Sequence, residues 1–476
     1  MGFTTIADGV TRGVDTFGDA ISGALFEPVI RLGVTGLARA GKTVFITSLV
    51  ANLMDRGRMP GLVAAADGRI QAAFLQPQPD DIVPRFDFES HLRALTGEAP
   101  HWPESTRAVS ELRLSLRVRP AGLLAGMTGP RTVHLDIVDY PGEWLLDLAL
   151  LDKSYAEWSA EVLARIEGRE EARDFRALVA RTDGSARLEE SAAQALATTF
   201  TGYLAAARDA GYHDCTPGRF LLPGDLAGSP VLTFAPLPEP AGGAPRGAIW
   251  REMARRYDAY RREVVKPFFR DHFARIDRQV VLVDALGAIH DGPHAVEDMR
   301  RAMGDILGAF RAGRNAFLTR LLSGRRVEKI LFAATKADHL HHSQHARLTA
   351  IMTALTRAAR DRAEFAGAET QAMAIAALRA TVEETRVHAG RNLDCVRGTL
   401  LKPDGSRGRQ AAFHAGELPQ DPARLLGPAH DGARAWLDAE YGAMTFAPAK
   451  LSLRPGEGPP HIRLDRAAQF LIGDRL

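Results

Sequence analysis

Hydrophobic and polar residues alternate along this chain in blocks of two different periods. An extended apolar run from Val29 to Val34 leads into a glycine-rich segment, and a helical apolar pattern begins at Val44. Two runs with strand-like alternation follow at 112–118 and 133–137. The glycine-rich connection between those two runs predicts an antiparallel pair of strands.

Strand-like apolar runs return later in the chain, at 279–283, 329–334 and 372–376. Helical stretches at about 294–322 and 342–364 separate these three runs. Alternation of strands with helices predicts a mostly parallel sheet. We therefore expect an α/β fold with a mostly parallel sheet and one antiparallel edge strand.

The long segment between the strand at 133–137 and the strand at 279–283 is helical and charged. A Pro/Gly-rich interruption at about 217–247 divides it. A segment of this length between two strands predicts an inserted helical subdomain, because structureless loops are rarely so long. The tail beyond about 380 mixes short strands with turns and ends in a helical run at 464–472, which predicts an α+β extension.

The first residues repeat apolar side chains at helix spacing, which predicts a helix that packs on its own domain or lies on a membrane or partner. The expected division of the chain is an N-terminal helix at 1–27, a first core part at 28–142, a helical insertion at 143–278, a second core part at 279–380, and a C-terminal extension packing on the core at 381–476.

Composition narrows the class of protein. Hydrophobic residues make up 46% and charged residues 25%, as in ordinary globular proteins, and a net charge of +2 argues against a nucleic-acid partner. Cys215 and Cys395 lie far apart without metal-ligand spacing. No apolar run approaches the roughly 20 residues that span a bilayer. We expect a cytoplasmic protein; peripheral attachment at the inner membrane is the alternative, and direct lipid binding stays open.

The segment from Gly36 to Thr43 is a complete G-x-x-x-x-G-K-[ST] phosphate loop between the first predicted strand and a helix. Its backbone N–H groups would surround phosphate, Lys42 would reach the β- and γ-phosphates, and Thr43 would be a magnesium ligand. The expected phosphate-binding residues are Gly36, Arg39, Ala40, Gly41, Lys42, Thr43 and Val44.

A second motif, Asp139-Tyr140-Pro141-Gly142, ends the strand at 133–137 and has the D-x-x-G form. Asp139 would hold magnesium directly or through water, and the N–H of Gly142 would sense the γ-phosphate. The alternative is that Asp139 only caps a turn. Glu143 stands where many GTPases carry a water-orienting glutamine, so we expect slow hydrolysis or a structural role for this glutamate.

The third motif, Thr335-Lys336-Ala337-Asp338, follows the strand at 329–334 and resembles the [NT]-K-x-D element that recognises guanine. A carboxylate at Asp338 can accept from both N1–H and the 2-amino group of guanine, which adenine lacks. Lys336 would lie along the base, and Ala377 and Leu378 would back it. The alternative is that Asp338 is the N-cap of the following helix.

A threonine that closes over magnesium and γ-phosphate should precede the strand at 112–118. Thr106 is our choice, with Ser105 second, and an ordinary polar turn is the alternative. Arg39 and Arg107 are the two residues that would supply the charge of an arginine finger within the chain, unless they are simply solvated.

Four histidines, His339, His341, His342 and His345, follow the third motif. His341 and His345 have the i, i+4 spacing of a helical metal site, but no glutamate accompanies them as in H-E-x-x-H. We therefore favour the start of a helix beside the base pocket over a metal site.

Together with Trp102–Arg107 and the ending Pro460–Asp465, these three motifs resemble the YcjX-like family of bacterial P-loop GTPases over essentially the whole chain. The resemblance implies a Ras-like core that uses GTP/GDP and Mg²⁺. It also implies a stress-associated cytoplasmic protein with a functional link to a membrane protein, as an unknown effector.

Three functions fit these predictions. The first is a GTP-hydrolysing switch, in which order at 105–107 and 139–144 reports the γ-phosphate to the helical insertion. The second is a remodelling NTPase at membranes. The third, a small-molecule kinase, is disfavoured because Asp338 and the antiparallel pair have no task in it.

Overall fold

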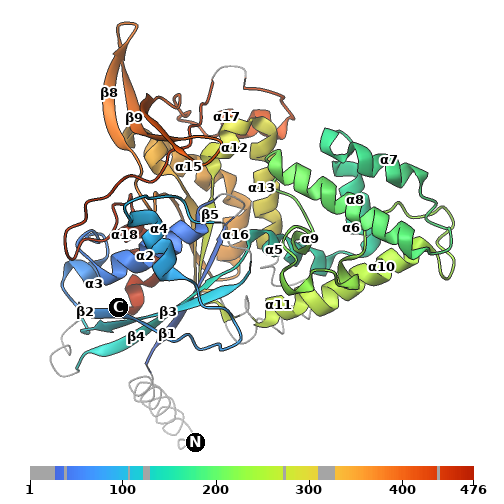
Figure 1. The fold of residues 1–476 in the computed structure, drawn as a ribbon, viewed down its shortest axis with the longest axis horizontal. Helices are drawn as coiled ribbons and strands as arrows, with labels where there is room; N and C mark the ends of the chain where they lie inside the picture. Colours follow the sequence, from blue (N-terminus) through green and yellow to red (C-terminus); the bar gives the residue numbers. More distant parts are fainter. Residues whose placement is uncertain are drawn as a thin grey trace, which may run out of the picture.

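A seven-stranded sheet forms the centre of the molecule (Figure 1), with the strand order β2-β3-β4-β1-β5-β6-β7. The computed structural model describes residues 27–36, 40–104, 108–121, 129–271, 275–308, 327–436 and 440–476. The strands are β1 (Val29–Gly36), β2 (Ile70–Gln76), β3 (Ser110–Val118), β4 (Arg131–Asp139), β5 (Arg278–Val283), β6 (Lys329–Ala334) and β7 (Glu369–Ala374). β4, β1, β5, β6 and β7 run parallel to one another, while β3 is antiparallel to both β4 and β2.

The sheet confirms the predicted α/β class, but the antiparallel strand is not the edge strand. The edge on that side is β2, which pairs with β3 and lies in the segment between α2 (Lys42–Met54) and β3, where the sequence pattern predicted no strand. The same segment forms α3 (Val63–Ala66) and α4 (Phe88–Thr96). β2 escaped prediction because most of its residues are half-buried or exposed, so its sequence lacks a clear two-residue period.

Alternate residues of the central strands enter two separate apolar clusters, because successive side chains of a strand point to opposite faces. One face of β5, including Val280 and Leu282, packs with α2 (Lys42–Met54) and α18 (Leu464–Ile472). The other face, including Val281, packs with α13 (Pro293–Gly308) and α15 (His345–Leu355). Helices on both faces explain why β5 and β6 are continuous apolar runs.

The chain between β4 and β5 is helical, as predicted, and extends away from the sheet (Figure 1). Its helices are α5 (Gly142–Leu146), α6 (Tyr155–Arg165), α7 (Arg173–Arg181), α8 (Glu190–Asp209), α9 (Gly218–Leu221), α10 (Ile249–Tyr260) and α11 (Lys266–Asp271), with the 3-10 helices η1 (Asp147–Asp152), η2 (Glu170–Ala172), η3 (Gly224–Leu226) and η4 (Pro230–Leu232) and the π-helical turn η5 (Arg261–Val265). Trp158 stacks on Tyr257, with 5.0 Å between ring centroids, and Phe200 and Phe234 meet Trp158 edge-on. These rings belong to the apolar cluster that continues into β4 and β5, so the insertion shares its core with the sheet.

The C-terminal part forms a second, three-stranded antiparallel sheet in the order β10-β9-β8. Its strands are β8 (Val382–His388), β9 (Arg391–Leu401) and β10 (Arg407–Phe413), and the hairpin of β8 and β9 projects from the molecule (Figure 1). The described parts of the chain also contain the helices α12 (Ala285–Asp291), α16 (Arg357–Phe365) and α17 (Ala423–His430), with η7 (Ala337–His339), η8 (His342–Gln344) and η9 (Gly473–Arg475). The chain then returns to the core, where the N–H of Ala376 donates to Ile462 O at 3.1 Å.

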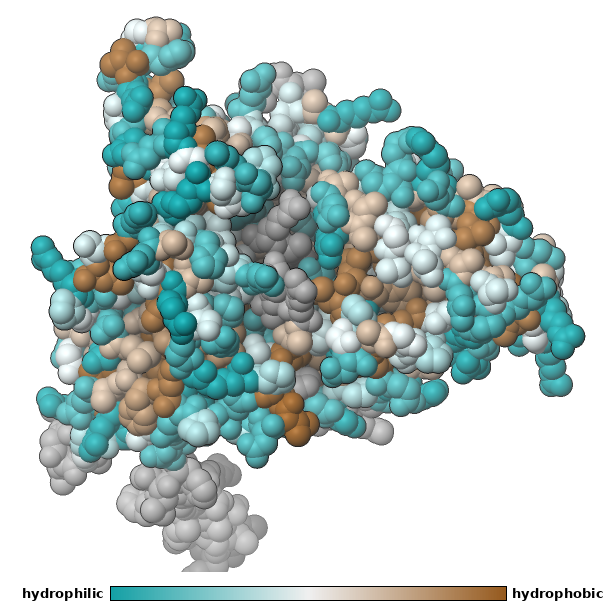
Figure 2. Space-filling view, viewed as in Figure 1, coloured by the Kyte–Doolittle hydropathy of each residue, from teal (hydrophilic) through white to brown (hydrophobic). Residues whose placement is uncertain are grey.

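The visible face of the molecule is mainly hydrophilic, with apolar residues gathered where the insertion meets the sheet (Figure 2). In the described ranges, no helix combines the length and the apolar character that crossing a bilayer requires. The N-terminal stripe expected to form a helix lies, up to residue 26, outside the described residues. The division of the chain into domains stays a prediction.

Candidate functional site

The three predicted motifs lie at the same edge of the sheet, because five neighbouring strands run parallel and end there. Gly36 is the last residue of β1, Asp139 the last of β4, and Thr335 the first after β6. Asp139 is in register with Val34 of β1. Ligands of open α/β sheets bind at this carboxyl edge.

The start of α2 has the properties of an anion site. Gly41 precedes the helix with φ = +79°, a left-handed conformation that favours glycine. Within the described residues, α2 has no side-chain cap and no acidic residue in its first turn, as is typical of a helix N-terminus that binds an anion. Lys42 Nζ donates to the carbonyl of Gly36 at 3.2 Å, which holds the ammonium beside the loop. Residues 37–39 of the loop, including Arg39, lie outside the described residues.

Gly36 needs to be glycine for a steric reason. A Cβ at this position would lie 2.9 Å from both Cβ and the carbonyl oxygen of Leu282 on β5. Ala40, on the other side of the loop, is buried as well. The backbone therefore approaches β5 closely where the phosphate loop leaves the sheet.

The oxygen ligands expected for magnesium fit that ion in their chemistry. Thr43 is buried in the first turn of α2, and Asp139 is buried at the end of β4. A hydroxyl and a carboxylate are oxygen donors of the kind that Mg²⁺ prefers. Gly142, the first residue of α5, is buried, and Glu143 beside it is half-buried. Thr106, with Ser105 and Arg107, lies outside the described residues.

The loop at 335–338 is held by backbone hydrogen bonds from the neighbouring strands. The N–H of Thr335 donates to Val283 O at 2.9 Å, and the N–H of Ala337 donates to Ile375 O at 3.0 Å. Lys336 between them has φ = +59°, in the left-handed region. The structure therefore brings the third motif together with the segment after β7 that contains Ala377 and Leu378.

Asp338 is buried, and its Oδ2 accepts a hydrogen bond from the N–H of Ala380 at 2.8 Å. The hydroxyl of Thr381 donates to the backbone carbonyl of Asp338. The interpretation of Asp338 as an N-cap of the next helix is wrong, because its carboxylate bonds to the segment after β7.

Asp284 is a further candidate residue, which the sequence prediction missed. It follows β5 directly, accepts from the N–H of Gly287 at 3.1 Å as the N-cap of α12, and forms an ion pair with Lys336. The sequence could have indicated Asp284 by its position, because an aspartate directly after a buried parallel strand lies at the edge of the sheet where ligands bind.

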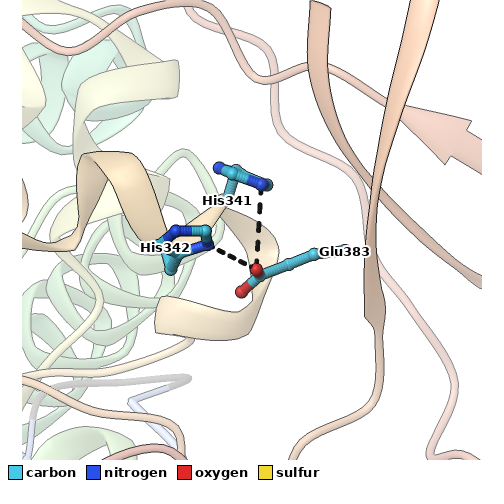
Figure 3. A group of neighbouring side chains, drawn as sticks. All are labelled: His341, His342 and Glu383. Carbon is cyan, nitrogen blue, oxygen red and sulfur yellow. Dashed lines mark hydrogen bonds and ion pairs between the residues drawn. The ribbon is translucent and has the colours of Figure 1, made fainter.

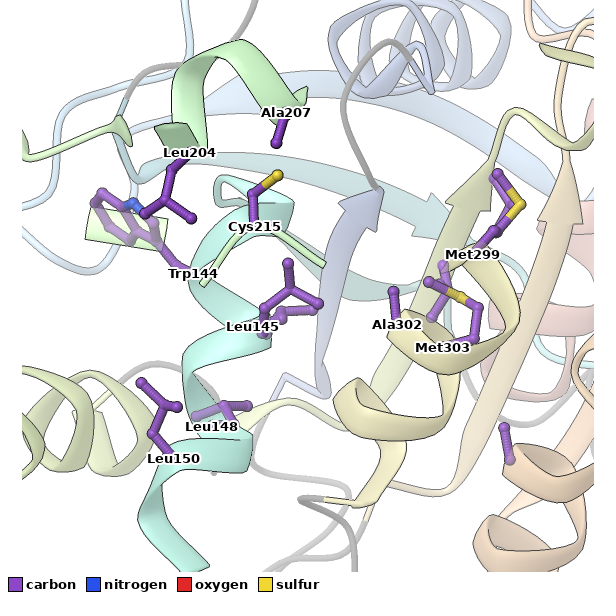
Figure 4. Packing of buried hydrophobic residues seen from close by; sticks show 14 of the residues in the cluster. Trp144, Leu145, Leu148, Leu150, Leu204, Ala207, Cys215, Met299, Ala302 and Met303 are labelled. Carbon is purple, nitrogen blue, oxygen red and sulfur yellow. The ribbon is translucent and has the colours of Figure 1, made fainter. Parts of the chain in front are cut away.

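Helix α5 and the following η1 pack against the rest of the insertion through side chains (Figure 4). The indole N–H of Trp144 donates to Leu222 O at 3.1 Å, and the guanidinium of Arg219 lies 3.2 Å from the centroid of the Trp144 ring. Asp147 is buried and accepts hydrogen bonds from the N–H of Gly218 at 2.8 Å and from the Tyr260 hydroxyl. This residue was not identified from the sequence. Burial raises the pKa of Asp147 to about 6, although both hydrogen bonds act in the opposite direction.

The parallel sheet with β3 antiparallel beside β4, the glycine loop between β1 and α2, and the motifs at the carboxyl edge define a Ras-like P-loop fold. The model of the YcjX-like family, DUF463, matches residues 30–476, so the chain belongs to this family. The resemblance noted in the motifs is thereby confirmed.

Two relatives cover nearly the whole chain. The protein named "Ras-like GTPase YcjX" from Escherichia coli (strain K12) is 37% identical over 460 residues, which are 94% of this chain and 96% of the relative. The protein of the same name from Shewanella oneidensis is 35% identical over 472 residues, 94% of each chain.

Proposed function

We propose that this protein binds guanine nucleotides, hydrolyses GTP to GDP and phosphate, and acts as a nucleotide-dependent switch. The observation that carries the proposal is that the α2 N-terminus and the 335–338 loop both lie at the carboxyl edge of one sheet, on either side of β5. The names of the two relatives support GTP as the nucleotide.

In this proposal, phosphate binds the N–H groups at residues 40–44 and the ammonium of Lys42. Thr43 and Asp139 hold Mg²⁺, which neutralises phosphate charge when bound. Asp338 accepts from guanine, and the stem of Lys336, fixed by Asp284, lies along the base.

The switch proposal rests on α5. Its first residues, Gly142 and Glu143, follow Asp139 directly, and a methyl group on Gly218 of α9 would overlap the carbonyl oxygen of Glu143. Such close packing cannot absorb a shift of α5 without moving α9. A change at the γ-phosphate that displaces Gly142 is therefore passed to the insertion.

Slow hydrolysis follows from the carboxylate of Glu143, which repels the γ-phosphate unless a cation offsets it. Arg39 and Arg107 are the proposed sources of that cation. We expect Glu143→Gln to speed phosphate release, because the amide keeps the hydrogen-bonding capacity and removes the charge.

Competitive binding of GDP and ADP to the full-length protein tests the nucleotide proposal. We expect GDP to bind at least about 100-fold more tightly than ADP, since a site built to pair with donor groups rejects ligands that lack them. Asp338→Asn should shift the preference toward xanthine nucleotides. The asparagine retains an oxygen for the Ala380 N–H, so this variant should keep its fold.

Lys42→Ala should abolish binding of either nucleotide, whereas Lys402→Ala, which removes an exposed lysine far from the motifs, should change nothing. Equal affinity for ADP and GDP, with no effect of Asp338→Asn, would contradict guanine recognition at the 335–338 loop.

A further inference from the structure

Two histidines after the 335–338 loop converge with a glutamate of the C-terminal sheet (Figure 3). His341 and His342 come from the start of η8, and Glu383 comes from β8. The distance from His342 Nδ1 to Glu383 Oε2 is 2.6 Å, and that from His341 Nε2 to the same oxygen is 3.7 Å. One ligand atom from each residue thus lies within 4.8 Å of the other two.

This grouping differs from the helical pair suggested by sequence spacing. His345 is buried, and its Nε2 lies 2.8 Å from the carbonyl oxygen of Ala337, so that nitrogen is already bonded within the protein. The glutamate missing from the local sequence is supplied by Glu383, about forty positions later.

The spacing of the three ligand atoms suits a transition metal. Bonds of about 2.0–2.1 Å in tetrahedral geometry place neighbouring ligand atoms about 3.3 Å apart. The observed 2.6 Å and 3.7 Å bracket that separation, so small side-chain rotations would admit an ion. Two imidazoles with one carboxylate favour ions such as Zn²⁺ over Mg²⁺ or Ca²⁺, which prefer oxygen ligands alone.

The surroundings orient the ligands as metal sites require. His341 Nδ1 lies 3.3 Å from Asp394 Oδ2 of β9 and 2.9 Å from Ser343 Oγ, and it accepts a longer bond of 3.4 Å from the N–H of Ser343, while Nε2 faces Glu383. Arg379 contacts the other carboxylate oxygen of Glu383, Oε1, at 3.6 Å, so Oε2 stays available. A carboxylate behind a metal-bound histidine is a common arrangement that sets the ring tautomer.

We propose that His341 Nε2, His342 Nδ1 and Glu383 Oε2 bind one divalent transition-metal ion of the Zn²⁺ class. The side chain of His341 is 12% exposed and that of His342 is 69% exposed, so an ion can enter from solvent and keep a water as fourth ligand. None of these three residues belongs to the proposed nucleotide site.

The ion would join the segment that follows the 335–338 loop to the hairpin of β8 and β9. Asp338 is already bonded to Ala380 and Thr381, and Glu383 follows them on β8. A metal at His341 and His342 closes a second link between the same two segments. Binding to the folded state alone then raises its stability in proportion to the logarithm of ion concentration.

The test uses full-length protein without a histidine tag, stripped of metal with EDTA and kept free of nucleotide. Zn²⁺ is titrated by calorimetry, and Co²⁺ is added to record its visible absorption. We expect one ion to bind per chain, and we expect the visible absorption of bound Co²⁺ to be that of an ion with about four ligands. His341→Ala combined with His342→Ala should lose this ion, and Glu383→Gln should bind at least about tenfold more weakly.

The matched control removes two exposed histidines elsewhere, His388→Ala with His430→Ala, and should bind Zn²⁺ like the unchanged protein. Asp394→Asn should weaken binding by about 10–100-fold, because it removes only the group behind His341. Failure to take up one ion, or uptake that survives both the double histidine change and Glu383→Gln, would overturn the proposal.

Discussion

The loop at 335–338 is anchored by backbone hydrogen bonds to the ends of β5 and β7, whereas α5 and η1 at 142–152 are anchored through their own side chains, Trp144 and Asp147, which bond to backbone groups of Leu222 and Gly218. Both segments follow parallel strands at the same edge of one sheet. Backbone bonds to strands depend little on side-chain identity or pH. Contacts through the Trp144 indole and the buried Asp147 carboxylate depend on side-chain identity, and those of Asp147 depend on pH as well.

For the proposed switch, the comparison identifies the segment whose contacts are sensitive to small changes. The 335–338 loop is held by bonds that such changes leave intact. The packing of α5 and η1 is sensitive to one proton on Asp147 or one methyl group on Gly218. A switch needs an element of the second kind, because a small local change must shift a packed neighbour.

The largest expected effect comes from Asp147. Its folded pKa of about 6 lies above its ordinary value of 3.8, so the folded state holds the proton more tightly than the unfolded chain does. This contribution to stability, about 3 kcal/mol in total, is fully present only below pH 3.8 and is lost as the pH rises through about 6.

Asp147→Asn should remove that loss, since the neutral amide can accept from the Gly218 N–H and donate to the Tyr260 hydroxyl oxygen. Urea unfolding of both proteins between pH 4 and 7 measures the difference. Parallel stability curves for the two proteins would show that Asp147 does not titrate in the fold.

A middle-sized effect is expected for Gly218→Ala. The added methyl group would overlap the backbone of Glu143, which should cost about 1–3 kcal/mol and change the rate of GTP hydrolysis through α5. Gly202→Ala in α8, where the new methyl group meets open space, should instead stabilise by about 0.5–1 kcal/mol. Denaturant unfolding and phosphate release are measured on both, and equal effects would remove the argument for coupling at Gly218.

The smallest effect on stability is expected at the 335–338 loop. Thr381→Val removes the hydroxyl that donates to Asp338 O and should cost about 1 kcal/mol of stability. GDP affinity should fall far less than in Asp338→Asn, because the Ala380 N–H still holds the carboxylate. Thr353→Val, which removes a similar hydroxyl bond inside α15, is the control. A loss of GDP affinity as large as that of Asp338→Asn would show that this loop, too, depends on side chains.

The parts of the fold that sequence predicted best are those with strong periodicity. β1, β5 and β6 are nearly continuous apolar runs because helices cover them on both faces, and α18 was predicted with its observed ends. β2 was missed because an edge strand needs few apolar residues and is defined by its hydrogen bonds to β3.

The chain by itself determined the local conformations and the order of the motifs. A glycine loop before a helix, an aspartate at a strand end and a T-K-x-D segment are short patterns whose chemistry follows from neighbouring residues. Only the tertiary structure decided which distant residues meet them: Asp284 with Lys336, Gly218 and Tyr260 with Asp147, and Glu383 with His341 and His342. The physical reason is that such contacts depend on strand order and on how helices pack, which no local period encodes.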